Sequence, residues 1–270
     1  MHRYLCQFGP VTLYSYGAML ALAFFLATLL AAKRAGGRKI NKSLIYDLVA
    51  YILVSSLAGA RLFFVAVNFE YYSGHPADIF KIWQGGLVLY GGIFFAFCAA
   101  VWFMKKHSLP VWKLVDVLAP PLALGVAIGR IGCFLNGCCY GKISAALGVC
   151  FPSKDIPPAY EQQLAQGLIA PGAQCSLPVL PTQLYESVVC LAIFGVLLFA
   201  EKKFRMFDGF LFWLFILLYS VQRFFMEGLR YYDGNFFVGP LTIGQITSLI
   251  LVAVSAAVIL KRSMPSKGRS

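Results

Sequence analysis

The chain has 270 residues, and because 60% of them are apolar and only 13% are charged, an ordinary soluble domain is excluded. The formal net charge of +12 would suit a protein that binds nucleic acid, but the basic residues stand in small groups between apolar runs, which excludes a nucleic-acid surface. The composition therefore indicates a membrane protein.

Apolar runs of membrane-spanning length follow one another along the chain. Residues 11–32, 82–104 and 234–260 contain no Asp, Glu, Lys or Arg, and each run exceeds the roughly 20 residues that a hydrocarbon core about 30 Å thick requires. The runs are too long for barrel strands and show no alternation of apolar and polar residues. The sequence predicts one domain, 1–270, an all-α bundle with transmembrane helices near 11–32, 44–67, 84–104, 114–132, 183–200, 209–229 and 240–260.

Basic residues mark alternate connections between these spans. Fifteen of the 23 Lys and Arg residues follow the first, third, fifth and seventh spans, within 33–42, 105–113, 202–205 and 261–269. The positive-inside rule places these connections in the cytoplasm, which puts the N-terminus outside and the C-terminus inside. We expect the first span to be retained rather than cleaved, because its basic cluster follows the apolar run.

The longest connection, 130–182, is consequently expected on the extracytoplasmic side. It begins within the segment GRIGCFLNGCCYG (129–141) and continues as a stretch rich in Pro, Gly and Ala, with one helical patch at 158–168. We expect an ordered loop or small cap with little core of its own. Before it, Pro120 and Pro121 should kink the fourth span.

Five cysteines fall in or next to this connection: Cys133, Cys138, Cys139, Cys150 and Cys175. An oxidising compartment favours one or two disulfides there, in a pairing that the sequence leaves open. The spacing C-x4-C-C is not a recognised zinc pattern, and His2, His75 and His107 are all distant in sequence. The sequence therefore predicts neither a metal site nor a cofactor.

Ionisable side chains stand in the outer halves or at the outer ends of the predicted spans: Arg61, Arg130, Glu186, Arg223 and Glu227. Facing lipid near the bilayer centre, each would cost about 3 kcal/mol on insertion scales, so we expect them to converge on one chamber that opens outward. Arg223 and Glu227 share a helical face, and Arg230 follows three residues later. A structural salt bridge would explain this pattern, as would a site for an anionic lipid headgroup.

Together these residues lie in motifs that resemble one family, the bacterial prolipoprotein diacylglyceryl transferases. Its signature G-R-x-G-N-F-x-N-G-E-x-W-G stands here as GRIGCFLNGCCYG (129–141). The other spans carry, in order, YSYG, GARLFFVAVN, WQGGLVLYGG, PTQLYES, QRFFMEGLR and TIGQITS. The resemblance runs from about residue 9 to 260, with one motif per span.

The resemblance implies a seven-helix enzyme of the bacterial cytoplasmic (inner) membrane. Its implied activity is transfer of the diacylglyceryl group of phosphatidylglycerol to the lipobox cysteine in the signal peptide of a prelipoprotein, which forms a thioether and releases glycerol 1-phosphate. Arg130 would bind the lipid phosphate, and Arg223 and Glu227 would be the essential pair. The other implied substrate-binding residues are Tyr16, Asn136, Gly141, Arg61, Gln183 and Arg230.

The chain departs from the family pattern at three positions. Tyr90 stands where the family often has histidine, Cys133 replaces the first asparagine of the signature, and Cys138 replaces its glutamate. Tyr90 is a poor base at an ordinary pKa near 10, so we expect it to position substrate, while Glu227 either orients an arginine or accepts the thiol proton.

Two other functions remain open at this stage. One is a lipid-translocating protein, although the predicted cytoplasmic halves of the spans offer no polar path and no internal repeat is evident. The other is a divergent paralogue that has lost catalysis.

Overall fold

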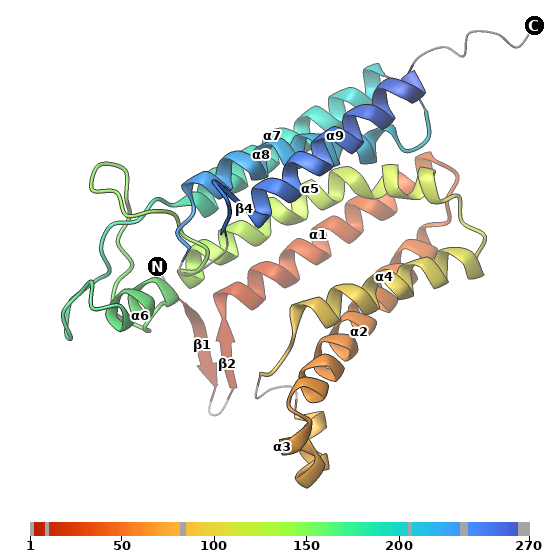
Figure 1. The fold of residues 1–270 in the computed structure, drawn as a ribbon. Coiled ribbons are helices and arrows are strands. Elements are labelled where there is room, and N and C mark those ends of the chain that lie inside the picture. Colours follow the sequence, from red (N-terminus) through yellow and green to blue (C-terminus); the bar gives the residue numbers. More distant parts are fainter. Residues whose placement is uncertain (1–2, 9–10, 82–84, 205–206, 233–236, 264–270) are drawn as a thin grey trace, which may run out of the picture. The chain divides into compact units, whose positions relative to one another are not determined.

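A computed structural model describes residues 3–8, 11–81, 85–204, 207–232 and 237–263 (Figure 1). The predicted fold class is confirmed, because seven helices are long and apolar enough to cross a membrane: α1 (Ser15–Gly37), α2 (Lys42–Val67), α4 (Leu89–Lys106), α5 (Val111–Asn136), α7 (Thr182–Lys203), α8 (Phe210–Leu229) and α9 (Ile243–Ser263). Large apolar side chains such as Phe25, Phe97 and Phe199 are exposed on them, as a hydrocarbon solvent allows. The chain is a multi-pass membrane protein.

Several residues used in the sequence analysis lie outside the described part of the chain. They are His2, Trp83, Gln84, Arg205, Lys267 and Arg269.

The start of the first span was predicted too early. Residues 11–14 belong instead to an antiparallel hairpin of β1 (Tyr4–Phe8) and β2 (Val11–Tyr14), in which Tyr4 pairs with Tyr14. The Arg3 guanidinium donates to the carbonyls of Asp155 and Ile156 at 3.0 and 2.7 Å. The hairpin is therefore tied to the long connection, an anchor that the hydropathy of residues 11–14 does not reveal.

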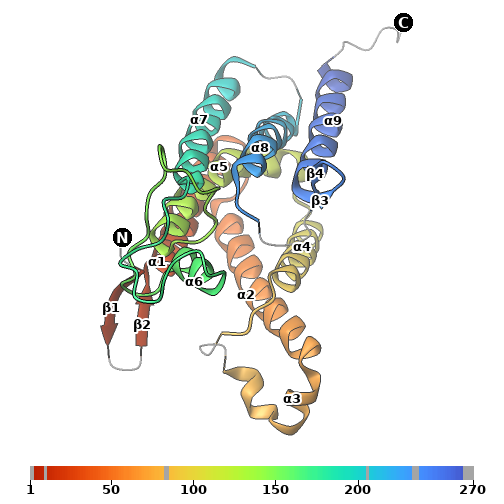
Figure 2. The same cartoon turned by 60° about the vertical axis from the view of Figure 1, so that its left-hand side comes forward.

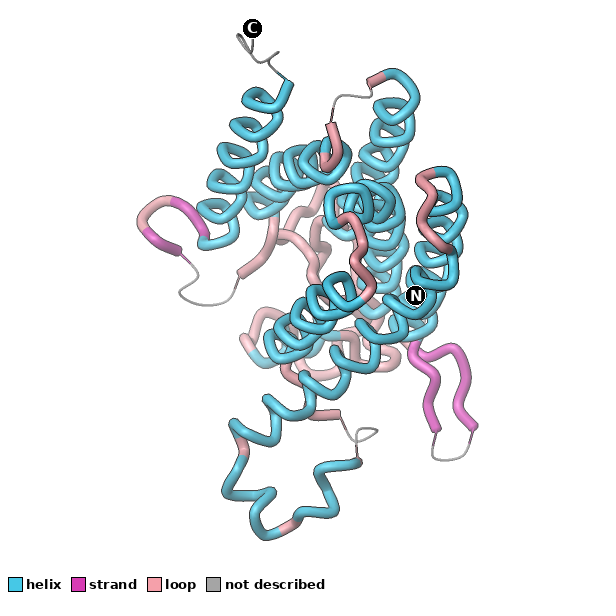
Figure 3. Tube along the Cα trace, turned by 90° about the vertical axis from the view of Figure 1, so that its right-hand side faces the viewer, coloured by secondary structure: helices cyan, strands magenta, loops and turns pink. Residues whose placement is uncertain are grey.

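Short elements occupy the connections (Figure 3). They are α3 (Phe69–Gly74), the 3-10 helix η1 (Pro76–Phe80), α6 (Pro158–Ala165) and the strand pair β3 (Phe237–Val238) and β4 (Leu241–Thr242). The predicted helical patch at 158–168 is confirmed by α6. The third span begins at Leu89 rather than near 84.

One compact unit contains residues 1–29 and 115–270. In it α8 packs against α7 and α9 (Figure 2), and Ala119 and Ala123 of α5 share a buried cluster with side chains of α7 and α8. The buried cluster consists of Ala119, Ala123, Ile193, Leu197, Ala200, Phe210, Leu211 and Phe215. α5 continues as helix through Pro120 and Pro121.

A buried carboxylate of α5 lies in the predicted cytoplasmic half of the fourth span. Asp116 is 2% exposed, and it accepts hydrogen bonds from the backbone N–H groups of Gly209 and Phe212 at 2.8 and 3.0 Å. These N–H groups lie at the start of α8, where the backbone N–H groups have no acceptor within the helix. Asp116 therefore caps α8, which is a structural task rather than part of a transport path.

The connection between α5 and α7 has a small core, formed by Tyr140, Phe151, Ala159 and Val179. Val179 bridges to Ile143 and Val149, and Pro152 bridges to Cys175. The segment is therefore an ordered cap, as expected.

The second compact unit contains residues 30–114, and α2 packs on α4 within it. Glycines permit the close approach: a Cβ on Gly59 would lie 2.7 Å from the Gly91 carbonyl oxygen, and a Cβ on Gly91 would lie 2.5 Å from that of Gly59. A Cβ on Gly92 would lie 3.0 Å from Ser56 Oγ. Gly91 and Gly92 are thus explained by helix packing.

Substitution Gly91→Ala should separate α2 from α4, because the new methyl group would meet a backbone oxygen that cannot rotate away. We expect a loss of about 1–3 kcal/mol in unfolding free energy, the usual cost of overpacking. Thermal unfolding of the detergent-solubilised protein measures it. Gly195→Ala is the matched control, since nothing lies within 4 Å of a Cβ there. An equally small effect of both substitutions would contradict the packing argument.

Candidate functional site

The segment GRIGCFLNGCCYG ends α5 with a specific turn. The Gly137 N–H donates to the Phe134 carbonyl and the Cys138 N–H to the Cys133 carbonyl, both at 3.1 Å, which is the Schellman pattern of helix termination. Gly137 has φ +74°, the left-handed conformation that this motif requires. Cys139 also has a left-handed φ of +60°. The turn therefore reverses the chain and places Cys138 and Cys139 beside the last turns of α5.

The first turn of α7 holds this reversal in place. Thr182 Oγ1 donates to the Cys139 carbonyl at 3.0 Å, and Gln183 Nε2 donates to the Cys138 carbonyl at 2.7 Å. A Cβ on Gly141 would lie 2.7 Å from both the Leu229 carbonyl oxygen and Thr182 Cγ2. Gly141 and Gln183 were expected to bind substrate. Their observed contacts instead stabilise the turn that carries Cys138 and Cys139.

The centre of the site is a carboxylate shared by two arginines. Glu186 on α7 pairs through Oε2 with Arg130 Nε on α5, and through Oε1 with Arg223 Nη1 on α8 at 3.1 Å. The Glu186 side chain is only 3% exposed, against 16% for Arg130 and 23% for Arg223. The carboxylate is therefore the most deeply buried group of the cluster, and the two guanidinium groups are more accessible.

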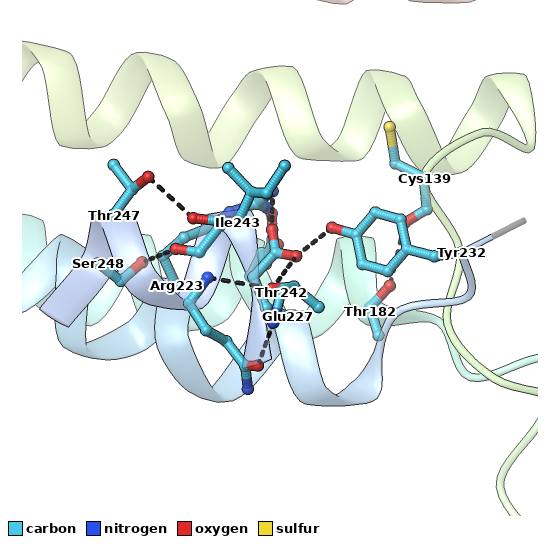
Figure 4. A network of polar contacts seen from close by, with 12 residues as sticks. Cys139, Thr182, Arg223, Glu227, Tyr232, Thr242, Ile243, Thr247 and Ser248 are labelled. Atoms are coloured by element: carbon cyan, nitrogen blue, oxygen red, sulfur yellow. Dashed lines mark hydrogen bonds and ion pairs between the residues drawn. The ribbon is translucent and has the colours of Figure 1, made fainter. Parts of the chain in front are cut away.

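A second carboxylate extends this cluster along α8 (Figure 4). Glu227 pairs with Arg223 Nη2 through Oε1, and its Oε2 accepts hydrogen bonds from the Tyr232 hydroxyl and, at 3.4 Å, from Thr242 Oγ1. A Cβ on Gly244 would lie 2.7 Å from Glu227 Cδ, so the start of α9 packs directly on the carboxylate. We call Arg130, Glu186, Arg223 and Glu227 the ion-pair chain.

Sequence reasoning did not single out Tyr232 or Thr242. Thr242 begins the motif TIGQITS, in which the resemblance implied no site residue. Tyr232 lies just beyond the end of α8. Burial and the hydrogen bond to Glu227 raise the pKa of Tyr232, so its hydroxyl stays protonated and able to donate at neutral pH.

Three more of the expected residues lie near the ion-pair chain. A Cβ on Gly132 would lie 3.4 Å from Tyr16 Cδ2, so α1 meets α5 here, and Tyr16 is within electrostatic range of Arg130. The Asn136 side chain hydrogen-bonds the Cys138 thiol. Burial disfavours the charged form of Arg230, but the negative charges of Cys139 and Glu186 together have a larger effect and raise the pKa of Arg230. Arg230 therefore adds a cation to this end of the unit.

Arg61 and Tyr90 belong to the second unit, which is described by itself. Arg61 is buried, and its guanidinium donates to carbonyls of η1 (Asp78 and Ile79), of Lys81, and of Gly85 and Gly86 before α4. It also lies over the rings of Phe64 and Tyr72. Its observed contacts thus hold the loop that precedes α4. Tyr90 stands in the first turn of α4 and is 79% exposed.

The expected disulfides do not form, because all eight cysteines are free thiols in the structure. Cys138 Sγ donates to the Cys133 carbonyl at 3.7 Å, and the Cys150 and Cys175 thiols are hydrogen-bonded to each other. Hydrogen bonds from Cys133 and Cys138 lower the pKa of the Cys139 thiol, and the charges of Arg230 and Arg130 act in the same direction.

The arrangement is suited to binding an anionic group. Both arginines are fixed by buried carboxylates before any ligand arrives, and a guanidinium presents a fork of N–H donors that matches phosphate oxygens. The predicted convergence of Arg130 and Arg223 is confirmed by their shared partner Glu186.

Comparisons with known proteins point to one family. The family model described as prolipoprotein diacylglyceryl transferase matches residues 3–261. A phosphatidylglycerol–prolipoprotein diacylglyceryl transferase of Bacillus mycoides is 34% identical over 269 residues, which cover 97% of this chain and 92% of the relative. A protein of the same name from Nostoc sp. is 32% identical over 275 residues, covering 97% and 91%.

Substitution Glu186→Gln should leave two guanidinium groups without their shared counter-charge. Breaking a buried ion pair typically costs about 3–5 kcal/mol, so we expect a clear drop in the thermal unfolding midpoint of the purified protein. Glu161→Gln on the exposed face of α6 is the control and should unfold like the unmodified protein. Equal midpoints for both variants would show that Glu186 does not organise the cluster.

Proposed function

The chain belongs to the prolipoprotein diacylglyceryl transferase family and is a membrane enzyme that transfers the diacylglyceryl group of phosphatidylglycerol to prolipoproteins; we propose that the ion-pair chain forms its active site. The observation that carries the proposal is that Arg130 and Arg223, from different helices, share the buried carboxylate of Glu186.

The reaction requires a site for a phosphate that becomes a leaving group. The substrate sulfur forms a bond to the glyceryl carbon, the bond from that carbon to the phosphate oxygen breaks, and glycerol 1-phosphate departs with the additional negative charge. Groups that are already oriented toward developing charge lower the barrier most effectively. We assign this task to Arg130 and Arg223.

The two arginines are well prepared for this task. Glu186 holds Arg130 through Nε, so the terminal nitrogens of Arg130 are the atoms that would meet a phosphate. Arg223 is held at both terminal nitrogens, by Glu186 and Glu227, which fixes the plane of its guanidinium. The side chains cannot relax away from the phosphate without breaking buried ion pairs.

We assign Glu227 to orient Arg223 rather than to accept the thiol proton. Its side chain is only 2% exposed, and Arg223, Tyr232 and Thr242 already use its two oxygens. Both oxygens are therefore occupied by protein donors and are not available to a substrate thiol. Tyr232 is then a positioning residue that acts through Glu227.

The remaining expected residues are placed around these. Tyr16, Asn136 and Arg230 would contact the lipid or the incoming peptide, while Gly141 and Gln183 act through the turn that they build. Arg61 would shape the loop before Tyr90. We further propose that the peptide substrate presents the lipobox cysteine of its signal peptide, and that the protein resides in the bacterial inner membrane with its N-terminus outside and its C-terminus in the cytoplasm.

Substitution Arg223→Lys should lower turnover by roughly 100-fold, because an ammonium group cannot bridge Glu186, Glu227 and a phosphate with fixed geometry. Product is measured as the thioether-linked lipopeptide formed from phosphatidylglycerol and a lipobox peptide in proteoliposomes. Arg34→Lys, in the last turn of α1, is the control and should keep full activity. Wild-type turnover by Arg223→Lys would remove Arg223 from the mechanism, and no product from the unmodified protein would favour an inactive paralogue.

Tyr90 is expected to position substrate rather than to accept its proton. Tyr90→Phe should therefore retain turnover within about tenfold, because only a hydrogen bond worth roughly 1 kcal/mol is lost. Tyr90→His restores the residue that is common in the family and should also be active. A complete loss in Tyr90→Phe, rescued by Tyr90→His, would instead identify residue 90 as the base.

A further inference from the structure

Three thiols gather beside the ion-pair chain, on residues that the proposed mechanism leaves unused. The sulfur atoms of Cys133, Cys138 and Cys139 all lie within 4.8 Å of one another. Cys133 stands one helical turn after Arg130, and Cys139 lies next to Thr182 at the same end of the unit as Tyr232 and Glu227 (Figure 4).

This spacing is close to what a metal ion requires. Three thiolates around a tetrahedral zinc ion, with Zn–S bonds of about 2.3 Å, would be separated by about 3.8 Å. The thiols would have to move together by no more than about 1 Å. The sequence spacing C-x4-C-C gave no indication of this cluster because the Schellman turn and the left-handed Cys139, which fold the chain back onto α5, create it.

The backbone that carries these thiols is fixed from outside the cluster. Thr182 and Gln183 bind the carbonyls of Cys139 and Cys138. Gln183 is 1% exposed, and among the described residues its Oε1 has no hydrogen-bond partner, so a buried acceptor is left over next to the turn. Such an orphaned group calls for a water molecule or ligand that the protein atoms do not supply.

Two arginine side chains lie close to the cluster. Arg230 and Arg130 both act electrostatically on Cys139. Three thiolates with one Zn²⁺ carry a net charge of −1. Because Arg130 is already paired with Glu186, Arg230 is the cation that offsets this charge.

We propose that Cys133, Cys138 and Cys139 bind one zinc ion as three thiolates, and that the fourth coordination position accepts the thiol of the incoming peptide substrate. Three protein ligands with one open position is the pattern of catalytic rather than structural zinc. The site lies next to Arg130, so a thiolate held there would face a phosphate bound by that arginine. The proposal rests on the proposed function for its substrate.

The chemistry balances without a protein base. Coordination releases the proton of the substrate thiol to solvent, because a thiol bound to zinc is deprotonated. The bound sulfur then supplies the electron pair for the new bond to the glyceryl carbon, and the pair of the broken carbon–oxygen bond leaves on the phosphate. The resulting thioether is a weak ligand and departs, while zinc keeps its oxidation state. Activation by zinc would also explain why this chain functions with Tyr90 in place of histidine.

Metal content tests the site directly. The full-length protein, purified in detergent without chelators, should contain about one zinc per chain, and Cys138→Ser and Cys139→Ser should each lose most of it. The control is the double variant Cys150→Ser/Cys175→Ser, which alters the other neighbouring thiol pair in the same cap and should keep its zinc. Absence of zinc from the unmodified protein, or its retention in Cys138→Ser and Cys139→Ser, would overturn the proposal.

Cobalt tests the open position without relying on turnover. Replacement of zinc by Co²⁺ should give the intense charge-transfer and visible bands of tetrahedral cobalt thiolate. A lipobox peptide should shift these bands, and the same peptide with serine in place of cysteine should not. If the cobalt absorption bands do not shift when the cysteine peptide is added, the proposed role of the fourth coordination position is wrong. Alkylation and mass spectrometry that find Cys133, Cys138 or Cys139 in a disulfide in freshly isolated protein would overturn the whole site.

These readouts separate the two proposals. A zinc-loaded protein whose cobalt form responds to the peptide, but which forms no thioether, would contradict the ion-pair chain as active site and leave the metal site standing. A protein that forms thioether at full rate after zinc is removed would contradict the metal site and leave the ion-pair chain standing.

Discussion

The shared carboxylate of Glu186 is the interaction on which the site depends. Two like-charged guanidinium groups do not approach each other in a membrane protein unless an anion lies between them, and Glu186 supplies that anion from a third helix. Because the carboxylate is more deeply buried than either arginine, the positive charge is directed away from the core. The ion pairs therefore link α5, α7 and α8, and they hold in place the guanidinium groups to which we assign phosphate binding.

Some residues in the motifs around this carboxylate form hydrogen bonds, and others are glycines that allow neighbouring atoms to approach closely. Thr182 and Gln183 fasten the turn after α5, whereas Gly141 and Gly244 are small because a backbone oxygen or a carboxylate occupies the space of a side chain. Gly141 and Gln183, which were expected to touch substrate, thus contact the protein's own backbone. This is how a site on several helices keeps its geometry without ligand.

The spans and the convergence of Arg130 with Arg223 could be predicted because both follow from the cost of placing polar groups in hydrocarbon. The hairpin at residues 4–14 could not, since its anchor is a contact between Arg3 and a loop about 150 residues later, and no local pattern reports that contact. Asp116 was overlooked because a carboxylate that caps a neighbouring helix looks like any other interruption of an apolar run. The cysteine cluster escaped notice because it depends on the turn after α5, where Gly137 and Cys139 adopt left-handed conformations that the sequence spacing does not report.

The link between Arg3 and the carbonyls of Asp155 and Ile156 joins the beginning of the chain to its middle. During synthesis the first helix leaves the ribosome long before those carbonyls exist, so the segment ahead of it has no docking partner until the spans α2, α4 and α5 have also been made. Completion of the N-terminal end of α1, and with it the placement of Tyr16, therefore belongs to a late stage of assembly rather than to insertion of the first helix.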